Sequence, residues 1–283
     1  MVTNAHAPAT QVIVPLAPYV VKIGGRALEG EARAELARDV AAVAGRVVLV
    51  HGGGADVSTW CTRLGIEPRF HDGLRITDPA TLDVAVAVLG GLSNKRWVAL
   101  LADHGVRALG LCALDAGIAD VVAHPQSAVL GAVGEVRAID AAALRTLLDF
   151  GITPVLASIG ACEGELVNIN ADDLASAVAG ALATPALVLL SDTPGLVLDG
   201  AVVPQLDARG LGEALDHPQV KGGMRPKLLA AQRALESGTA RVIIAAWNGP
   251  GTLSSLLTGK GQGTMLVREH APVLAAAPSG GRS

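Results

Sequence analysis

The chain has 283 residues, of which 51% are hydrophobic and only 2% aromatic, and its formal net charge is −4. This length supports one large domain or two lobes, and the core must consist of Ala, Val, Leu and Ile, which suits a parallel sheet covered by helices. The negative net charge argues against sequence-independent nucleic-acid binding, so an anionic ligand would need a local positive site.

We find no targeting or membrane-spanning signal in the sequence. Residues 1–18 lack a basic segment followed by an apolar one and read as a loose N-terminal arm, and residues 271–283 read as a flexible tail. The longest weakly polar run, residues 175–190, is interrupted by polar residues and a proline and is too short to span a membrane. The cysteines have no metal-ligand spacing, which indicates a reduced, cytoplasmic chain; they are Cys61, Cys112 and Cys162.

Strand-like and helix-like segments alternate through the first half of the chain. Thr77-Asp78-Pro79 is typical of a helix start, because a capping side chain precedes a proline in the first turn. Gly90-Gly91 marks a possible break in that helix. The predicted elements are a strand at 19–23, a helix at 30–44, a strand at 46–50, a helix at 56–64, a helix at 77–102 and a strand at 106–111.

Residues 112–139 interrupt this alternation. They are short, glycine-punctuated stretches of alternating hydrophobicity, and we interpret them as a β-hairpin over the site. The second half then resumes the pattern, with a turn at Pro194-Gly195 and a short hairpin around Asp199-Gly200. Its other predicted elements are helices at 141–150, 172–182 and 224–236, and strands at 153–159, 186–190, 240–246 and 264–267.

The order of elements predicts an α/β fold. We expect a three-layer αβα sandwich around a mostly parallel central sheet, with a β-hairpin lid. A coarse boundary falls near residues 160–170. The N-lobe, residues 19–165, would bind the small substrate and dimerise, and the C-lobe, residues 166–270, would bind a nucleotide.

Three glycine-rich segments from distant parts of the chain predict a phosphate-handling site. They are Lys22-Ile23-Gly24-Gly25, His51-Gly52-Gly53-Gly54 and Gly222-Gly223-Met224-Arg225-Pro226-Lys227. Each can offer backbone N–H groups to an anionic oxygen with no side chain in the way. Neither lysine lies in a Walker-type loop, and the glycine spacing and acidic residue of a dinucleotide site are missing, so we expect phosphoryl transfer rather than hydride transfer.

The two lysines are the first candidates for catalysis. Lys22 stands at the carboxyl end of a strand, where α/β sheets bind ligands, although a solvated turn lysine is the alternative. Lys227 lies one turn inside the helix that Gly222-Gly223 opens, so it can reach phosphate oxygens that face the helix N-terminus. We interpret His51 as a structural hydrogen-bonding residue rather than a general base.

Further polar positions complete the candidate site. Arg75 precedes a capped helix and could grip a carboxylate with two parallel bonds, or simply face solvent. Asn168 could hydrogen-bond a substrate, and Asp172 could pair with the lysines, although helix capping by Asn170 or Asp172 is the simpler interpretation. Asp192-Thr193-Pro194-Gly195 follows a buried strand, where the edge of a nucleotide could dock.

Together these motifs resemble the amino-acid kinase superfamily and, within it, the acetylglutamate kinases. The resemblance spans residues 19–268, and eight markers occur in the family's order. They are KIGG at 22–25, HGGG at 51–54, DGLRITD at 72–78, NK at 94–95, VNINADD at 167–173, LSDTPGL at 190–196, GGMRPK at 222–227 and GQGTM at 261–265. The combination is specific, although no single marker is.

The resemblance implies transfer of the γ-phosphoryl group of ATP to the side-chain carboxylate of N-acetyl-L-glutamate, in arginine biosynthesis. Lys22 and Lys227 would stabilise the transition state, and Asp172 would hold both lysines in place. The residues that would bind the acetylated substrate are Gly53, Gly54, Arg75 and Asn168. The residues that would bind the nucleotide are Gly24, Gly25, Ser191, Asp192, Gly195, Leu196, Lys221 and Gly223.

The resemblance also implies that Mg²⁺ arrives mainly on the nucleotide, with no metal site of the protein's own, and that the chain forms a homo-oligomer, with a dimer favoured. Feedback-inhibited members carry an extra N-terminal helix and a C-terminal arginine-binding segment. Residues 1–18 contain three helix-breaking prolines, and residues 247–251 look different from that segment, so we expect an arginine-insensitive enzyme. Arg225 is bulkier and more basic than the resemblance leads us to expect.

The main alternative is the related kinase of lysine biosynthesis, which phosphorylates 2-aminoadipate or glutamate attached to a carrier protein. That enzyme needs a more open, basic substrate mouth, whereas the compact segment around Gly73 favours the small acetylated substrate. A non-catalytic nucleotide sensor on the same fold would be expected to lose a lysine or Asp172, and all three are present.

Overall fold

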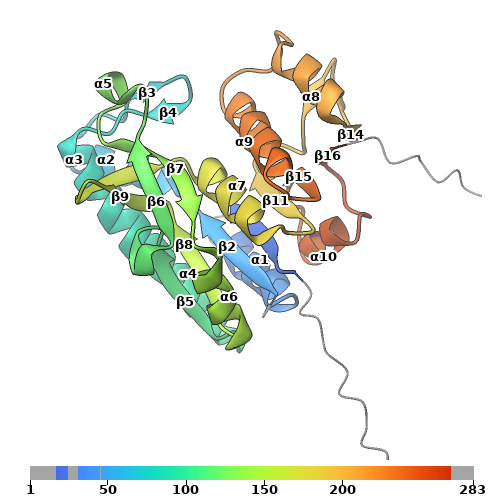
Figure 1. The fold of residues 1–283 in the computed structure, drawn as a ribbon, viewed down its shortest axis with the longest axis horizontal. Helices are drawn as coiled ribbons and strands as arrows, with labels where there is room; N and C mark the ends of the chain where they lie inside the picture. The colour runs from blue at the N-terminus through green and yellow to red at the C-terminus, as the bar shows by residue number, and fades with distance from the viewer. Residues whose placement is uncertain (1–16, 25–30, 45, 269–283) are drawn as a thin grey trace, which may run out of the picture.

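Helices cover both faces of one large sheet, and a smaller sheet packs over part of it (Figure 1). The computed structural model describes residues 17–24, 31–44 and 46–268. The expected N-terminal arm falls almost entirely outside these described residues, and the expected tail and Gly25 fall wholly outside them. The predicted three-layer α/β architecture is confirmed.

The large sheet has eight strands, and neighbouring strands run parallel except for β15 and β16. A mostly parallel sheet is therefore confirmed. In spatial order its strands are β14 (Gln205–Leu206), β16 (Thr264–Val267), β15 (Arg241–Ala246), β11 (Leu187–Ser191), β1 (Tyr19–Ile23), β2 (Val47–His51), β8 (Thr153–Ala157) and β5 (Ala108–Cys112).

The central strands are mostly apolar because helices bury both of their faces, and their polar residues include Lys22, His51 and Ser191 near the carboxyl ends. Every residue of β2 and β11 is buried. In β2, Val48 and Val50 enter one core and Val47 and Leu49 enter the other. The helices of the first core are α6 (Ala141–Asp149), α7 (Ala171–Leu182), α8 (Ala208–Leu215) and α9 (Met224–Glu236), and those of the second are α1 (Glu31–Ala41), α4 (Asn94–Asp103) and α10 (Thr252–Leu257).

The predicted break at Gly90-Gly91 is wrong. The helix runs from α3 (Pro79–Ala85) through a π-helical stretch, η1 (Val86–Ser93), directly into α4. Gly90 serves close packing, since a Cβ on it would lie 2.9 Å from Cys112 Sγ. Asp78 caps the helix start as predicted, by accepting a 2.8 Å hydrogen bond from the backbone N–H of Thr81.

This continuous helix, Pro79–Asp103, is long and apolar enough by length and composition to cross a membrane, which sequence reasoning missed. One such helix is weak evidence, because a helix packed in a protein core passes the same test. Here α4 contacts α1, β5 and β8, and Trp97 and Leu101 enter the second core.

The predicted hairpin at 112–139 is part of a larger unit. β6 (Ala119–Ala123) and β7 (Val133–Ile139) do pair antiparallel, but α5 (Ser127–Leu130) separates them along the chain. They form a four-stranded sheet with β10 (Glu165–Ile169) and β9 (Ile159–Cys162). The expected lobe boundary falls at the start of β10, and the large sheet contains strands from both sides of it.

The tight hairpin beside the site is a different segment, which sequence reasoning did not predict. β3 (Phe70–His71) and β4 (Leu74–Arg75) pair antiparallel around Asp72-Gly73. Both turn residues have positive φ, 48° and 83°, as a two-residue hairpin turn requires. The hairpin predicted around Asp199-Gly200 is confirmed, with strands β12 (Val197–Leu198) and β13 (Ala201–Val202).

Candidate active site

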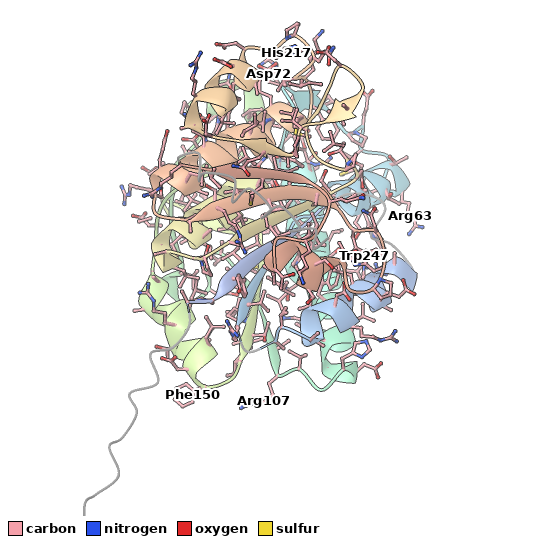
Figure 2. All side chains as sticks on the ribbon, turned by 90° about the vertical axis from the view of Figure 1, so that its right-hand side faces the viewer. Arg63, Asp72, Arg107, Phe150, His217 and Trp247 are labelled. Atoms are coloured by element: carbon pink, nitrogen blue, oxygen red, sulfur yellow. The ribbon has the colours of Figure 1, made fainter. Side chains whose placement is uncertain are left out.

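The carboxyl ends of β1, β2 and β11 meet at one edge of the large sheet, where α/β proteins bind ligands. Figure 2 shows Asp72 of the β3–β4 turn and His217 after α8 at one end of the molecule, with Phe150 and Arg107 at the other. The hairpin turn also touches the GGMRPK segment, since a Cβ on Gly73 would lie 3.6 Å from Gly222 O and Pro226 Cγ. Segments from both halves of the chain therefore meet near this edge of the sheet.

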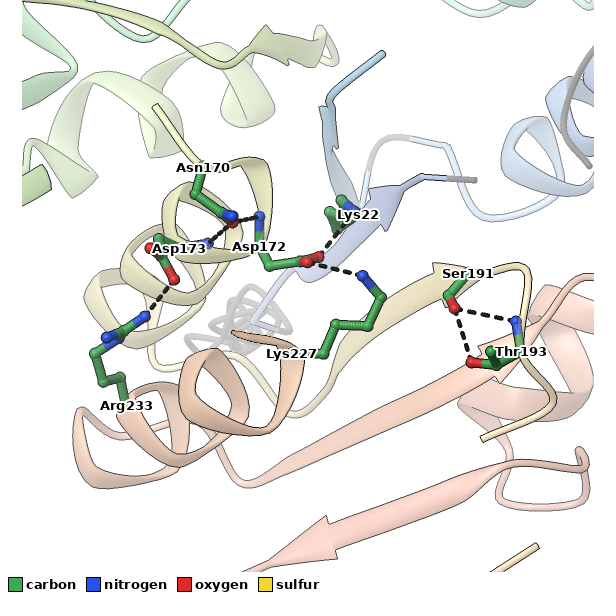
Figure 3. A network of polar contacts seen from close by, with 8 residues as sticks. All are labelled: Lys22, Asn170, Asp172, Asp173, Ser191, Thr193, Lys227 and Arg233. Atoms are coloured by element: carbon green, nitrogen blue, oxygen red, sulfur yellow. Dashed lines mark hydrogen bonds and ion pairs between the residues drawn. The ribbon is translucent and has the colours of Figure 1, made fainter. Parts of the chain in front are cut away.

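Two lysines from opposite ends of the chain meet on one carboxylate (Figure 3). Lys22 comes from β1, Asp172 from the first turn of α7, and Lys227 from the first turn of α9. Lys22 Nζ lies 2.8 Å from Asp172 Oδ1, and Lys227 Nζ donates a 2.9 Å hydrogen bond to Asp172 Oδ2. The structure thus brings the three predicted catalytic residues together.

Burial and charge together fix the protonation of this group. Burial alone would raise the pKa of the Asp172 carboxyl, but the ammonium groups of Lys22 and Lys227 outweigh it and lower the pKa to about 2. Burial lowers the pKa of the Lys22 ammonium, while Asp172 opposes this shift and Lys227 adds to it. The ionised Asp172 carboxylate therefore holds both lysine side chains together, an arrangement suited to an anionic ligand.

The start of α7 places Asp172 where both lysines reach it. Asn170 caps the helix, because its Oδ1 accepts hydrogen bonds from the backbone N–H groups of Asp172 at 2.8 Å and Asp173 at 3.2 Å. The positive end of the helix dipole also favours a carboxylate in this turn. Helix capping by Asn170 and lysine pairing by Asp172, the two interpretations of this segment, therefore hold together.

A cleft of about 200 Å³ opens beside the pair, and we call it the lysine cleft. Its lining includes Lys22, Gly24, Gly53, Gly54, Arg75, Asn168 and Asp172. Helix α2 (Gly54–Arg63) begins in its wall with Gly53 as N-cap, a residue with no side chain to occupy the first-turn N–H groups. A Cβ at Gly53 would lie only 2.7 Å from Leu89 Cδ2, so close packing requires glycine there.

Arg75 is held in the lysine cleft rather than exposed. Its Nη2 donates to Gly54 O at 2.7 Å and to Ser58 Oγ at 2.8 Å, and its guanidinium lies 4.7 Å from the centre of the Phe70 ring. Burial lowers the pKa of Arg75, but a guanidinium stays charged in proteins. Its buried Nη1 has no hydrogen-bond partner among the residues that the structure describes, so one donor is available to an anion.

Asn168 also lines the lysine cleft, from a position near the end of β10. Its Nδ2 donates a 3.3 Å hydrogen bond to Thr77 Oγ1, and Thr77 Oγ1 donates in turn to Arg75 O at 3.1 Å. The amide is thereby oriented, and its oxygen and second N–H remain to contact a substrate.

A second cleft, of about 510 Å³, adjoins the first, and we call it the outer cleft. It shares Gly24, Gly53 and Gly54 with the lysine cleft, and its further lining includes Asp192 and Gly223. Gly223 is the N-cap of α9, so the outer cleft also borders an uncapped helix start. Two adjoining clefts suit two substrates whose reacting groups meet between them.

The other residues that were predicted to bind the nucleotide differ in their burial and in whether they line a cleft. Ser191 lies at the buried end of β11. Leu196 is buried in the first core and its N–H donates to Thr264 Oγ1 at 2.8 Å, and a Cβ at Gly195 would lie 2.6 Å from the same oxygen. Lys221 is exposed and lines neither cleft. For these residues a role in nucleotide binding stays a prediction.

His51 is a structural residue, as interpreted from the sequence. Its Nε2 lies 3.1 Å from Asn94 Nδ2, which donates to it, and its Nδ1 lies 2.9 Å from Gly52 O. Burial lowers the pKa of His51 to about 4, so the ring is neutral at physiological pH. Both ring nitrogens are occupied, which leaves none for proton abstraction.

The role of Arg225 and part of the lining of the outer cleft were not predicted from the sequence. Arg225, which had no explanation, donates from Nη1 to Leu215 O and so ties the end of α8 to the start of α9. Phe70, Arg33 and Trp97 line the outer cleft, and only the rarity of aromatic residues in this chain could have drawn attention to two of them.

Gly24→Ala is expected to lower kcat about tenfold with little change in the melting temperature. A Cβ at Gly24 would collide with Lys22 Nζ, so the ammonium must shift at the end of its flexible stem, while Asp172 keeps Lys227 as a partner. Steady-state kinetics and thermal melting measure the two effects. Gly212→Ala in α8, where a Cβ would meet open space, is the matched control, and an unchanged kcat in Gly24→Ala would contradict the prediction.

Residues 18–246 match the amino acid kinase family. An acetylglutamate kinase from Methanopyrus kandleri is 42% identical over 254 residues, covering 86% of this chain and 98% of that protein. An acetylglutamate kinase from Chloroflexus aurantiacus is 45% identical over 201 residues, covering 70% of this chain and 79% of that protein.

Among solved structures, an N-acetylglutamate synthase from Neisseria gonorrhoeae, complexed with coenzyme A and N-acetyl-glutamate, is similar with a TM-score of 0.78 and 26% identity. The similarity covers 90% of this chain and 61% of that chain. The family match includes the segments that build the two clefts. The chain therefore belongs to the amino acid kinase family, and within that family it groups with the acetylglutamate kinases.

Proposed function

We propose that this protein transfers the γ-phosphoryl group of ATP to the side-chain carboxylate of N-acetyl-L-glutamate, a step of arginine biosynthesis. The observation that carries the proposal is the buried Asp172, which holds Lys22 and Lys227 together beside the lysine cleft, the smaller of two adjoining clefts. Relatives that are 42% and 45% identical and are named acetylglutamate kinase support this substrate.

The chemistry needs positive charge and alignment rather than a base. The acceptor carboxylate is already ionised at neutral pH, so no proton has to be removed before it attacks phosphorus. Lys22 and Lys227 would neutralise charge on the transferred phosphoryl group, and Asp172 would keep the two ammonium groups from repelling each other. The open N–H groups at the start of α2 would face the same oxygens.

We assign the lysine cleft to the acetylated amino acid and the outer cleft to the nucleotide. Arg75 would bind the α-carboxylate through its free Nη1, and Asn168 would bind near the acetamido group. Asp192 and Gly223 would border the nucleotide, with Lys227 reaching its β- and γ-phosphates from the first turn of α9. The reacting carboxylate and phosphorus would then meet at Gly53 and Gly54.

Three accompanying properties belong to the same proposal. Mg²⁺ would reach the site on the nucleotide phosphates, where it would neutralise their charge. The chain would work as a cytoplasmic homodimer, in keeping with its free cysteines. Turnover would not respond to arginine, and titration of the assay with L-arginine tests this directly.

The carrier-linked kinase of lysine biosynthesis is the alternative that the structure makes less attractive. An acceptor attached to a carrier protein needs an open, basic mouth, whereas the lysine cleft measures about 200 Å³ and is closed on one side by the β3–β4 hairpin. The cleft therefore suits a small free acceptor.

The direct test is a coupled assay with ATP, Mg²⁺ and N-acetylglutamate, in which hydroxylamine traps the acyl phosphate. We expect hydroxamate formation with N-acetylglutamate and none with carrier-linked 2-aminoadipate. Equilibrium dialysis should show binding of ATP and not of NAD. If only the carrier-linked acceptor were phosphorylated, the proposed function would be wrong and the activity would be that of the lysine-biosynthesis kinase.

Arg75→Lys is expected to raise KM for N-acetylglutamate about tenfold to hundredfold, because lysine keeps the charge but loses the paired donors that match a carboxylate. KM for ATP should stay within about twofold of its wild-type value. Initial-rate kinetics with each substrate varied in turn measure both constants. Arg69→Lys, at an exposed arginine paired with Asp78, is the control, and equal effects of the two changes would refute the assignment.

A further inference from the structure

Asp173 stands beside the lysine pair but outside the chemistry described above. It follows Asp172 in α7, and its carboxylate pairs with Arg233 of α9 (Figure 3). It lines a separate cavity of about 390 Å³ between β7, α7 and α9, and it lines neither the lysine cleft nor the outer cleft. No substrate contact therefore explains this ion pair.

Three polar contacts join α9 to α7, and their members on α9 are three residues apart. They are Lys227 Nζ to Asp172 Oδ2, Ser176 Oγ to Ala230 O at 2.7 Å, and Arg233 to Asp173. At 1.5 Å per residue, Lys227 and Arg233 are about 9 Å apart along α9, although their partners on α7 are neighbours in sequence. Anchors this far apart fix both the rotation and the sliding of α9 on α7, which a single contact cannot do.

The ionised carboxylate of Asp173 is not there to stabilise the fold. Burial raises the pKa of its carboxyl to about 6, Arg233 opposes that shift, and Asp172 and Glu135 add to it. Because the pKa is raised from 3.8, the stabilisation that protonated Asp173 provides is lost as the pH rises through about 6. At neutral pH the carboxylate is thus kept at a cost in stability, which is typical of a functional group.

We propose that Asp173 is a positioning residue for phosphoryl transfer, which acts through Arg233 to fix α9 so that Lys227 stays on Asp172 and within reach of the transferred group. The proposal rests on the proposed function of the lysine cleft. An ammonium contributes only when it lies within hydrogen-bond distance of the reacting oxygens, and a displacement of about 1 Å can cost as much as 100-fold in rate.

Asp173→Asn tests the proposal, because the amide keeps the size of the side chain and removes its charge. We expect kcat at about pH 8 to fall about tenfold, KM for both substrates to stay within about twofold, and the melting temperature to stay equal or rise. Glu213→Gln, which breaks the exposed Arg209–Glu213 pair, is the matched control and should leave kcat unchanged. A loss of kcat that accompanies a lower melting temperature would indicate a structural role and overturn the proposal.

The pH dependence provides a second readout. The charged groups around Asp173 are Arg233 on α9, Asp172 on α7, and Glu135 and Arg137 on β7. Wild-type Asp173 becomes mostly protonated below about pH 6, so the ratio of wild-type to Asp173→Asn kcat should narrow from about tenfold at pH 8 to about twofold at pH 5. A ratio that stays constant over this range would refute the role of the charge.

A double-mutant cycle distinguishes an effect of the Asp173–Arg233 ion pair on kcat from separate effects of the two residues. Arg233→Met should lower kcat to a similar extent, and adding Asp173→Asn to it should cause no further loss, because either change alone removes the anchor. Additive losses would contradict the pairing. If the wild type used another carboxylate acceptor instead of acetylglutamate, the proposed function would fail, and the same ratios measured with that acceptor would still decide the role of Asp173.

Discussion

Lys227→Ala is expected to lower kcat for acyl phosphate formation by about 10²–10³, with only a small change in the melting temperature. Lys227 Nζ lies 2.9 Å from Asp172 Oδ2 beside the lysine cleft, and alanine would leave the phosphoryl oxygens without its charge. The fold should survive because Asp172 keeps Lys22 as its partner and because Lys227 is more exposed than Lys22.

Lys22→Ala should lower kcat to the same extent, and Lys22→Met gives a cleaner comparison because methionine fills the buried space of the lysine stem. Single-turnover trapping of the acyl phosphate with hydroxylamine measures the chemical step for each variant. Lys260→Ala, at an exposed lysine after α10, controls for the loss of one positive charge. Activity within tenfold of wild type in a folded Lys22 or Lys227 variant would remove the basis of the kinase assignment.

The strands of the large sheet other than β14 could be predicted from sequence, most clearly where burial on both faces gives a nearly unbroken apolar run. β2 and β11 are continuous apolar runs, and each was placed within one or two residues of its observed bounds. Elements with a weaker pattern were missed. β3 and β4 have two residues each, and α10 has six, which is too short for a helical period to show.

The site could be predicted as a set of residues but not as a geometry. The glycine-rich motifs pointed to Lys22 and Lys227, and Asp172 was a candidate partner beside a helix-capping interpretation, a role that the family resemblance then favoured. Only the fold shows that both lysines reach the Asp172 carboxylate, at 2.8 Å and 2.9 Å, because β1, α7 and α9 are far apart in the chain. The same limit hid Arg233, whose pairing with Asp173 joins two helices and leaves no local pattern.

A glycine can be needed either to expose a backbone N–H group to a ligand or to make room for a neighbouring side chain. Gly24 and Gly53 were expected to offer N–H groups to anions, and the structure adds a steric reason for each, since a Cβ would meet Lys22 Nζ or Leu89 Cδ2. Gly90 was interpreted as a helix break, and it instead admits Cys112 against an uninterrupted helix. A glycine alone does not tell which reason applies, because the atom that excludes a side chain comes from elsewhere in the fold.

Asp172→Asn is expected to reduce both stability and catalysis. The amide leaves two ammonium groups facing each other in a buried site, and removing one partner of a buried ion pair costs about 3–5 kcal/mol of the free energy of unfolding. The value of kcat should fall on the order of 10²-fold or more, because neither lysine is then held beside the lysine cleft. Denaturant unfolding and hydroxylamine trapping measure the two effects.

The loss of stability in Asp172→Asn should depend on pH with a defined sign. The folded pKa of Asp172, about 2, lies below its ordinary value of 3.8, so its contribution is complete above about pH 4 and is lost as the pH falls through about 2. The difference between wild type and variant should therefore be large at pH 7 and smaller near pH 3. Asp173→Asn is the internal control, because the pKa of Asp173 is shifted upwards. A difference that is equal at both pH values would show that Asp172 is not the counter-ion of the two lysines.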